Sequence, residues 1–282
     1  MITVTKIQEL KTIIKTARSQ GKMIGFVPTM GYLHEGHLSL ARQAKRENDL
    51  VVVSIFVNPI QFGPKEDFQT YPRDLKRDQE LLESVGVEVV FTPEKDEVYP
   101  ANFQTLVEVT GVSQGLCGQS RPGHFKGVAT VVAKLFNIVA PDRAYFGAKD
   151  AQQLRVIRQM TTDLNFNIEI ISCPIIRESD GLAMSSRNVY LNPDERRAAL
   201  VLYRALQTAE KKIAKGDREA GKLAEEMISL IQAEPLAVVD YVEIVDSKTL
   251  EPIKVIAGEV LIALAVRIGK TRLIDNMVFL VK

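Results

Sequence analysis

Apolar residues follow two different patterns over the first 176 residues of the chain. The set Ile7, Leu10, Ile13, Ile14 and Ala17 has the spacing of an amphipathic helix, which predicts a helix that ends before Gly21. Residues 50–57 form a continuous run that is apolar at every position except Ser54, which predicts a strand buried on both faces. The same reasoning predicts further helices over 37–48, 74–86, 128–139 and 150–164, and further strands over 24–27, 87–91, 144–146 and 168–173.

Strands of this kind, alternating with helices, indicate a parallel sheet that is covered by helices on each side. We therefore expect an α/β fold with a doubly wound, Rossmann-like sheet. In such sheets, ligands bind beyond the carboxyl ends of the strands, where the chain connections change direction. Functional residues are accordingly expected in the loops that follow strands.

The pattern changes beyond residue 176. Asn192 and Pro193 open one predicted helix, and a charged, alanine-rich segment predicts a second helix over 217–233. Three strands follow, and Gly269 and Lys270 form a hairpin turn between the last two of them. The strands are predicted over 238–245, 259–268 and 272–281. We expect a Rossmann-like domain of residues 1–176 and a smaller α+β domain of residues 177–282.

Composition excludes several classes of protein. The 282 residues exceed the common size of one domain, and hydrophobic and charged fractions of 46% and 25% argue against disorder. Lys and Arg exceed Asp and Glu by 36 to 35, so no nucleic-acid or lipid partner is expected to bind the chain as a whole. The sequence shows no secretory leader or membrane span, which predicts a cytoplasmic protein. Cys117 and Cys173 are expected to be reduced and buried.

Two of the chain's three histidines lie in one predicted strand-to-helix loop. His34 and His37 are flanked there by Gly31 and Gly36, within residues 28–37. Such a loop offers free backbone N–H groups and the positive end of a helix dipole, and imidazoles add side-chain donors, so the loop suits a phosphate. Zinc-protease helices place their histidines four apart, whereas these are three apart around a glycine, which disfavours catalytic zinc.

Polar side chains also gather in four later loops, at residues 56–63, 121–127, 146–153 and 177–188. Each of these segments, taken alone, is compatible with an exposed turn. In the first, Asn58 and Gln61 bracket a turn fixed by proline, where their amides can bind a polar ligand. In the last, Ser185 and Ser186 precede Arg187, and two hydroxyls beside a guanidinium form an anion clamp.

Six segments together resemble the pantoate–β-alanine ligase (pantothenate synthetase) family of the His-x-Gly-His nucleotidyltransferase superfamily, in family order and over essentially the full chain. They are residues 28–40, 56–62, 71–73, 121–127, 146–153 and 181–190. The resemblance implies an ATP-dependent ligase. In that reaction, ATP adenylates the carboxylate of pantoate and releases pyrophosphate. The amine of β-alanine then attacks the acyl-adenylate, which gives pantothenate and AMP.

The same resemblance implies which residues form the site. The implied ATP-binding set is Met30, Gly31, Tyr32, Leu33, His34, Glu35, Gly36, His37, Gly147, Ala148, Lys149, Asp150, Ile176, Met184, Ser185, Ser186 and Arg187. His34, His37, Lys149 and Arg187 are its implied catalytic members, with His37 as the proton donor. Asn58, Gln61 and Gln153 are the implied contacts of pantoate and β-alanine.

Magnesium is expected as a cofactor because it screens the triphosphate. Members of the family often carry an acidic pair just after the Tyr-Pro-Arg motif, whereas this chain reads Lys76-Arg77-Asp78 there. Asp78 is therefore the one candidate protein ligand, and phosphates and water are expected to hold most of the metal. The resemblance further implies a homodimer. Because water would hydrolyse the acyl-adenylate, we expect the second domain and the loop of residues 185–187 to close as a lid that excludes it.

Two alternatives remain open at this point. A related adenylyl- or cytidylyltransferase would act on a phosphorylated substrate, release pyrophosphate and make no AMP. A nucleotide-sensing regulator would keep the ATP site without its chemistry. The regulator predicts missing motif residues, whereas His34, His37, Lys149 and Arg187 are all present.

Overall fold

The computed structural model describes residues 1–64 and 66–281, which divide into two compact units. Unit 1 comprises Met1–Val109, Arg121–Ala148 and Gln153–Pro174. Unit 2 comprises Thr110–Ser120, Lys149–Gln152 and the chain from Ile175 onward. Two short segments that precede residue 176 thus pack with the second unit.

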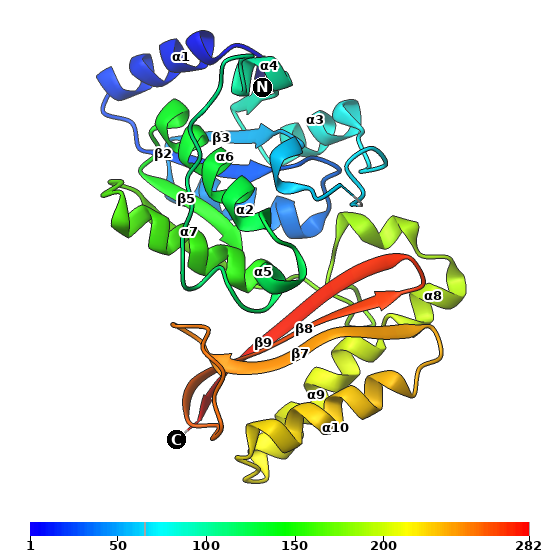
Figure 1. The fold of residues 1–282 in the computed structure, drawn as a ribbon. Helices are drawn as coiled ribbons and strands as arrows, with labels where there is room; N and C mark the ends of the chain where they lie inside the picture. The colour runs from blue at the N-terminus through cyan, green and yellow to red at the C-terminus, as the bar shows by residue number, and fades with distance from the viewer. Residues whose placement is uncertain (65, 282) are drawn as a thin grey trace. The chain divides into compact units, whose positions relative to one another are not determined.

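Unit 1 contains a six-stranded parallel sheet of order β1-β4-β3-β2-β5-β6 (Figure 1). Its strands are β1 (Ile2–Val4), β2 (Ile24–Thr29), β3 (Leu50–Ile55), β4 (Val89–Phe91), β5 (Arg143–Gly147) and β6 (Glu169–Cys173). From β2 the chain proceeds to β3 and β4 on one side, whereas β5 and β6 extend the sheet on the other side. The strand order therefore reverses between β2 and β5, where the fold rule places a ligand.

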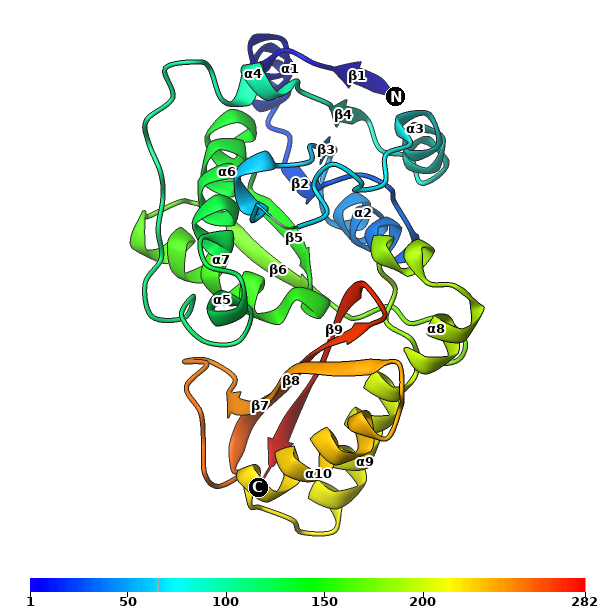
Figure 2. The same cartoon turned by 45° about the vertical axis from the view of Figure 1, so that its right-hand side comes forward.

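Helices cover both faces of this sheet. They are α1 (Ile7–Ser19), α2 (Glu35–Glu47), α3 (Leu75–Ser84), α4 (Lys95–Val98), α6 (His124–Val139) and α7 (Ala151–Asp163), with 3-10 turns η1 (Pro59–Gln61) and η2 (Ala148–Asp150). Figure 2 shows α6 and α7 on one face and α2 and α3 on the other. This arrangement confirms the predicted doubly wound fold.

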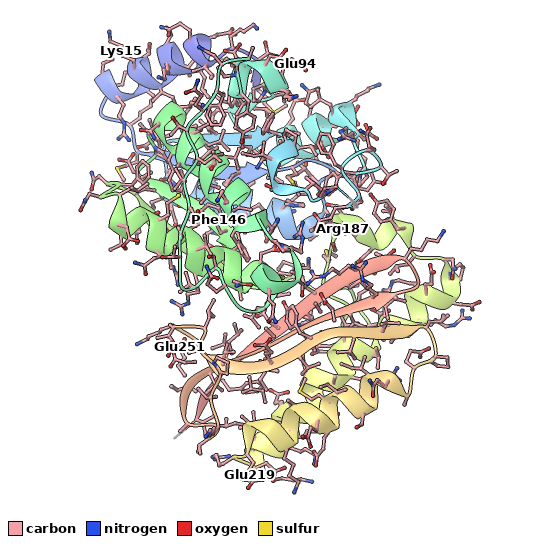
Figure 3. All side chains as sticks on the ribbon, viewed as in Figure 1. Lys15, Glu94, Phe146, Arg187, Glu219 and Glu251 are labelled. Carbon is pink, nitrogen blue, oxygen red and sulfur yellow. The ribbon has the colours of Figure 1, made fainter. Side chains whose placement is uncertain are left out.

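The interior of unit 1 is built from the apolar strands and the helix faces that cover them. Phe26, Phe91, Phe136 and Tyr145 are fully buried. Phe146, labelled in Figure 3, lies on β5 with its ring against that of Phe136. Leu33 is also fully buried, so the loop that carries the two histidines is anchored in this core.

The periodic pattern located most elements, and the differences lie at their ends and in the elements that it missed. The helix predicted from His37 begins at Glu35 because the His34 side chain caps it by accepting a hydrogen bond. The strand predicted over 50–57 ends at Ile55. Strand β1 was not predicted, since it has only three residues and two of them are exposed.

Unit 2 contains an antiparallel sheet of order β7-β8-β9. Its strands are β7 (Ala237–Asp246), β8 (Gly258–Ile268) and β9 (Thr271–Val281). Its helical segments are α5 (Cys117–Ser120), η3 (Ser186–Tyr190), α8 (Pro193–Ala198), α9 (Val201–Ala214) and α10 (Ala220–Gln232). Strands β8 and β9 pair up to Ile268 and Thr271, which confirms the hairpin at Gly269 and Lys270.

Alternate residues of β8 pack against helices α9 and α10. Leu264 and Val266 share one core with Leu206, Met227 and Ile231. Cys117 and Cys173 are both buried free thiols, as predicted. In the part of the chain that the structure describes, no helix combines the length and apolar character that crossing a membrane requires.

Candidate active site

The loop between β2 and α2 follows the strand next to the reversal in sheet order; His34 is its last residue, and His37 lies in the first turn of α2. It turns through two residues in the left-handed region, Gly31 at φ 82° and Tyr32 at φ 49°. Leu33 then enters the core, and His34 resumes an extended backbone at φ −139° as the cap of α2. The loop therefore presents His34 and His37 on the first turn of a helix.

The two imidazoles are held by backbone N–H groups. Nδ1 of His34 accepts from the N–H of Gly36 at 3.1 Å, and Nδ1 of His37 accepts from the N–H of His34 at 3.3 Å. The ring centroids lie 4.1 Å apart. Because each Nδ1 is an acceptor, the proton of each neutral ring resides on Nε2. Both rings are therefore Nε2–H donors, the form that binds phosphate oxygens.

The backbone N–H groups of this loop are largely engaged within the protein. Gly31 donates to Thr29 Oγ1 at 3.3 Å, and Tyr32 and Leu33 each donate to the Asp78 carboxylate. The N–H groups of His34 and Gly36 are used by the imidazoles. The expectation of free backbone donors for phosphate is therefore wrong at these five positions, because nearby side chains already accept from them.

Asp78, the candidate metal ligand, lies on α3 with only 1% of its surface exposed. Its Oδ2 and Oδ1 accept from the N–H groups of Tyr32 and Leu33, both at 2.7 Å. Burial raises the pKa of this carboxyl, and the two N–H donors oppose that rise. No group of three or more His, Cys, Asp or Glu side chains suited to a metal occurs among residues 1–64 and 66–281.

Asn58 and Gln61 belong to one buried amide network at the end of β3. The hydroxyl of Tyr99 donates to Asn58 Oδ1 at 2.8 Å. Asn58 Nδ2 donates to Gln61 Oε1 and to the carbonyl of Gly127, both at 3.0 Å. Since Gln61 Oε1 is an acceptor in this network, its Nε2 is the donor end, which lies 3.0 Å from the sulfur of Met30.

His124 has the opposite tautomer. Arg121 Nη1 lies 3.0 Å from His124 Nε2, and a guanidinium can only donate, so Nε2 is the acceptor. Nδ1 therefore carries the proton and donates to the carbonyl of Gln61 at 2.9 Å. Arg121 also binds Glu66 through two 2.6 Å hydrogen bonds. Burial raises the pKa of Glu66, but its hydrogen bonds and the nearby charge of Arg121 together have the larger, opposite effect. The net result is a pKa of about 2, below the ordinary value of 4.5.

The loop after β5 continues from Gly147 into η2 and α7. Gly147, Ala148 and Gln153 belong to unit 1, whereas Lys149 and Asp150 belong to unit 2. Within unit 2, the carbonyl of Lys149 accepts from Asn276 Nδ2 at 2.8 Å.

Residues 176–188 form a small folded segment of unit 2. The N–H of Met184 donates to the carbonyl of Ile176 at 3.0 Å, which holds these two predicted residues together. Ser185 caps η3 by accepting from the N–H of Arg187 at 3.2 Å. Ser186 is buried, and Arg187, labelled in Figure 3, is half-buried.

Two polar contacts that sequence reasoning missed stabilise this segment. Asn188 Nδ2 donates to Glu178 Oε1 at 2.9 Å and to the carbonyl of Ala183 at 3.2 Å. Arg177 forms a bidentate salt bridge with the buried Asp275, in which Nη1 donates to Oδ2 at 2.6 Å and Nη2 donates to Oδ1 at 2.9 Å. Sequence analysis placed Arg177 and Asn188 in the polar loop of residues 177–188, but no local signal connects Arg177 with Asp275.

A doubly wound parallel sheet, with Nε2–H donors on the helix that follows the strand at its switch point, defines an α/β protein of the nucleotide-binding class. A sequence profile described as Pantoate-beta-alanine ligase matches residues 2–278. The chain belongs to the pantoate–β-alanine ligase family, as its motifs predicted.

Individual relatives match this chain over nearly its full length. A pantothenate synthetase of Caldicellulosiruptor saccharolyticus is 60% identical over 278 residues, with 99% of each chain covered. A crystal structure of pantothenate synthetase from Thermus thermophilus matches with TM-score 0.94 at 47% identity, over 98% of this chain and 99% of that one. The Francisella tularensis ligase, complexed with β-γ ATP and β-alanine, matches with TM-score 0.80 at 38% identity, over 99% and 97%.

Proposed function

We propose that this protein is a pantoate–β-alanine ligase that forms pantothenate from pantoate, β-alanine and ATP. The observation that carries the proposal is family membership over residues 2–278. The neutral His34 and His37 pair, at the switch point of the sheet, supports it physically. Neither alternative from the sequence gains support from the family match, and a regulator would be expected to lack motif residues that this chain retains.

The first step is adenylation of the substrate carboxylate. A carboxylate oxygen attacks the α-phosphorus of ATP, the bond to the β-phosphate oxygen breaks, and pyrophosphate leaves with that electron pair. The carboxylate is already ionised at neutral pH, so the protein supplies position and charge stabilisation instead of a nucleophile. His34 and His37 donate hydrogen bonds through Nε2–H to phosphate oxygens whose negative charge grows in this step. The family resemblance assigns His37 as the proton donor; the neutral ring fills that role as a hydrogen-bond donor, because it does not release its Nε2 proton at neutral pH.

Asn58, Gln61 and Gln153 bind the organic substrates in this proposal. The Nε2 end of Gln61 is its donor end, so it suits the carboxylate or hydroxyl oxygens of pantoate. The amine of β-alanine then attacks the acyl carbon, the bond from that carbon to the phosphate oxygen breaks, and AMP leaves with the electron pair. The proton that the nitrogen loses as the amide forms passes to the departing phosphate or to water.

The remaining assigned residues bind ATP. Lys149 and Arg187 donate to phosphoryl oxygens, assisted by the hydroxyls of Ser185 and Ser186, and Gly147 and Asp150 hold the ribose. Ile176 and Met184 border the adenine. The other residues assigned to ATP binding line the nucleotide with their backbone; they are Met30, Gly31, Tyr32, Leu33, Glu35, Gly36 and Ala148.

Magnesium would neutralise phosphate charge when bound with ATP. The described residues do not form a protein cage for it, because Asp78 already accepts two backbone hydrogen bonds and no acidic cluster surrounds it. We therefore propose that any magnesium ion is held by phosphates and water. We also propose a cytoplasmic homodimer; sedimentation of the purified protein tests the dimer.

The proposal is tested by incubating the protein with ATP, magnesium, pantoate and β-alanine, and omitting each in turn while AMP and pantothenate are measured. We expect AMP only when all components are present, and pantoate-dependent exchange of pyrophosphate into ATP without β-alanine. AMP formation that ignores pantoate would reject the assigned substrate. Pyrophosphate release without AMP, from a phosphorylated substrate, would favour the nucleotidyltransferase alternative.

A further inference from the structure

We propose that Asp78 is a positioning residue, whose carboxylate fixes the loop that presents His34 and His37. This inference rests on the proposed function, because it assigns how the phosphate-binding pair of that site is oriented. It also replaces the metal-ligand role considered for Asp78. The juxtaposition that carries it is a buried carboxylate on α3 against two consecutive backbone N–H groups of the β2–α2 loop.

Consecutive backbone N–H groups in a left-handed turn form a concave site for an anion. Here the turn is made by Gly31 and Tyr32, and the N–H groups of Tyr32 and Leu33 point to one carboxylate. The anion is therefore part of the protein and comes from a residue 46 positions away from Tyr32. A phosphate bound at the loop must then accept hydrogen bonds from other groups, namely the imidazole Nε2–H donors.

The contact also stabilises an unfavourable backbone. Tyr32 has φ 49°, which a residue with a Cβ rarely adopts, and such conformations persist only when surrounding contacts hold them. Two 2.7 Å hydrogen bonds to a carboxylate supply such contacts. At Gly31, an added Cβ would lie 3.0 Å from Asp78 Oδ2 and 2.9 Å from Ile55 Cγ2, so the close approach requires glycine.

Arg77 completes the arrangement on the exposed side. Its Nη1 lies 3.8 Å from Asp78 Oδ1, and its guanidinium lies 5.1 Å from the centroid of the Tyr32 ring. The position beside Asp78 thus carries a cation, which disfavours a bound metal ion there. Helix α3 contacts the histidine loop through both side chains.

The test compares Asp78→Asn with Asp74→Asn, a matched change at the start of the same helix. Asp74 is exposed and accepts from the N–H of Arg77 as the cap of α3, a role that asparagine also fills. In Asp78→Asn, one of the two acceptors becomes an NH₂ group that faces a backbone N–H. We expect kcat for pantoate-dependent exchange to fall about 10–100-fold in Asp78→Asn and to stay unchanged in Asp74→Asn.

Ring nitrogen signals give a readout independent of activity. The chain has three histidines, so a ¹⁵N spectrum of the whole protein should show two Nε2–H rings, His34 and His37, and one Nδ1–H ring, His124. In Asp78→Asn we expect the first two rings to lose their single tautomer while His124 keeps its own. If the function proposal fails and the wild type is inactive, this spectrum still tests the role of Asp78.

Two results would overturn the inference. A raised magnesium requirement in Asp78→Asn, with activity restored by excess magnesium, would make Asp78 a metal ligand. Unchanged His34 and His37 signals in a folded variant would show that Asp78 does not orient them. Should Asp78→Asn fail to fold, Gly31→Ala perturbs the same contact from the loop side, and we expect the same change in tautomer signals with it.

Discussion

The hydroxyl of Tyr99 donates to Asn58 Oδ1 at 2.8 Å inside unit 1, and this bond anchors the buried amide network. Asn58 Nδ2 donates to the carbonyl of Gly127, which can only accept, so this end of the amide is also the one that donates to Gln61 Oε1. Gln61 is thereby left with its Nε2 as the donor for a ligand. The buried phenol of Tyr99 thus holds in place the network that determines which end of the glutamine amide faces a substrate.

Removing that hydroxyl in Tyr99→Phe should therefore affect substrate binding. We expect KM for pantoate to rise about 3–30-fold, which matches the loss of one or two hydrogen bonds, while KM for ATP changes little. Steady-state kinetics with each substrate varied in turn measures this. Tyr145→Phe is the matched control, since that buried hydroxyl binds Glu47 and Asn48 and does not contact the network. Equal effects of the two substitutions on pantoate would contradict the assignment.

Gly127 permits helix α6 to approach the turn that carries Gln61. A Cβ at this position would lie 2.5 Å from the carbonyl oxygen of Ile60 and 2.6 Å from Gln61 Cα. Gly127→Ala should displace this turn, destabilise the protein by about 1–3 kcal/mol and raise KM for pantoate. Gly221→Ala, in α10 with nothing within 4 Å of the added carbon, should be neutral or slightly stabilising. Chemical unfolding and kinetics of both variants check this, and equal stability changes would count against it.

The Glu66–Arg121 pair predicts a pH-dependent stability. The pKa of Glu66 is about 2 in the folded protein, below its ordinary value of 4.5. Its contribution is therefore complete above the ordinary pKa and is lost as pH falls toward 2. Glu66→Gln should cost on the order of 1–2 kcal/mol at neutral pH and progressively less in acid. Urea unfolding of both proteins across that range tests it; a cost that does not change with pH would contradict the pairing.

Arg177 neutralises the buried carboxylate of Asp275 in unit 2. Burial raises the pKa of Asp275, and Arg177 opposes that rise. Arg177→Gln should destabilise the protein by about 3–5 kcal/mol, because it leaves an unpaired buried charge. The loss should be smaller in acid, where the carboxyl takes up a proton, and smaller in the Arg177→Gln, Asp275→Asn double variant. Unfolding curves that show additive losses would exclude this coupling.

The fold could be predicted largely from the sequence because hydrophobic periodicity is a local property. Runs such as residues 50–55 must be buried whatever else the chain does, and their alternation with helices requires a parallel sheet. Short elements escaped detection, as β1 shows. The assignment of Thr110–Ser120 and Lys149–Gln152 to the second unit depends on contacts between distant parts of the chain, which periodicity does not report.

The sequence located the loops of the candidate site after the strands, but it did not predict the hydrogen bonds within them. The positions of His34, His37 and Gln61 followed from loops after strands and from the family motifs. The contacts of Asp78 with Tyr32 and of Tyr99 with Asn58 span 46 and 41 positions, and no local pattern encodes them. For the same reason, the loop N–H groups were predicted to be free but are occupied in the fold.

The central claim is that the His34 and His37 pair binds the polyphosphate during adenylation. Its most direct test is pantoate-dependent exchange of labelled pyrophosphate into ATP by His37→Ala, with circular dichroism recorded on the same sample. We predict a loss of exchange of about 100-fold or more with an unchanged spectrum, as expected for a group that stabilises transition-state charge. Exchange at the wild-type rate, or an unfolded spectrum, would contradict the account.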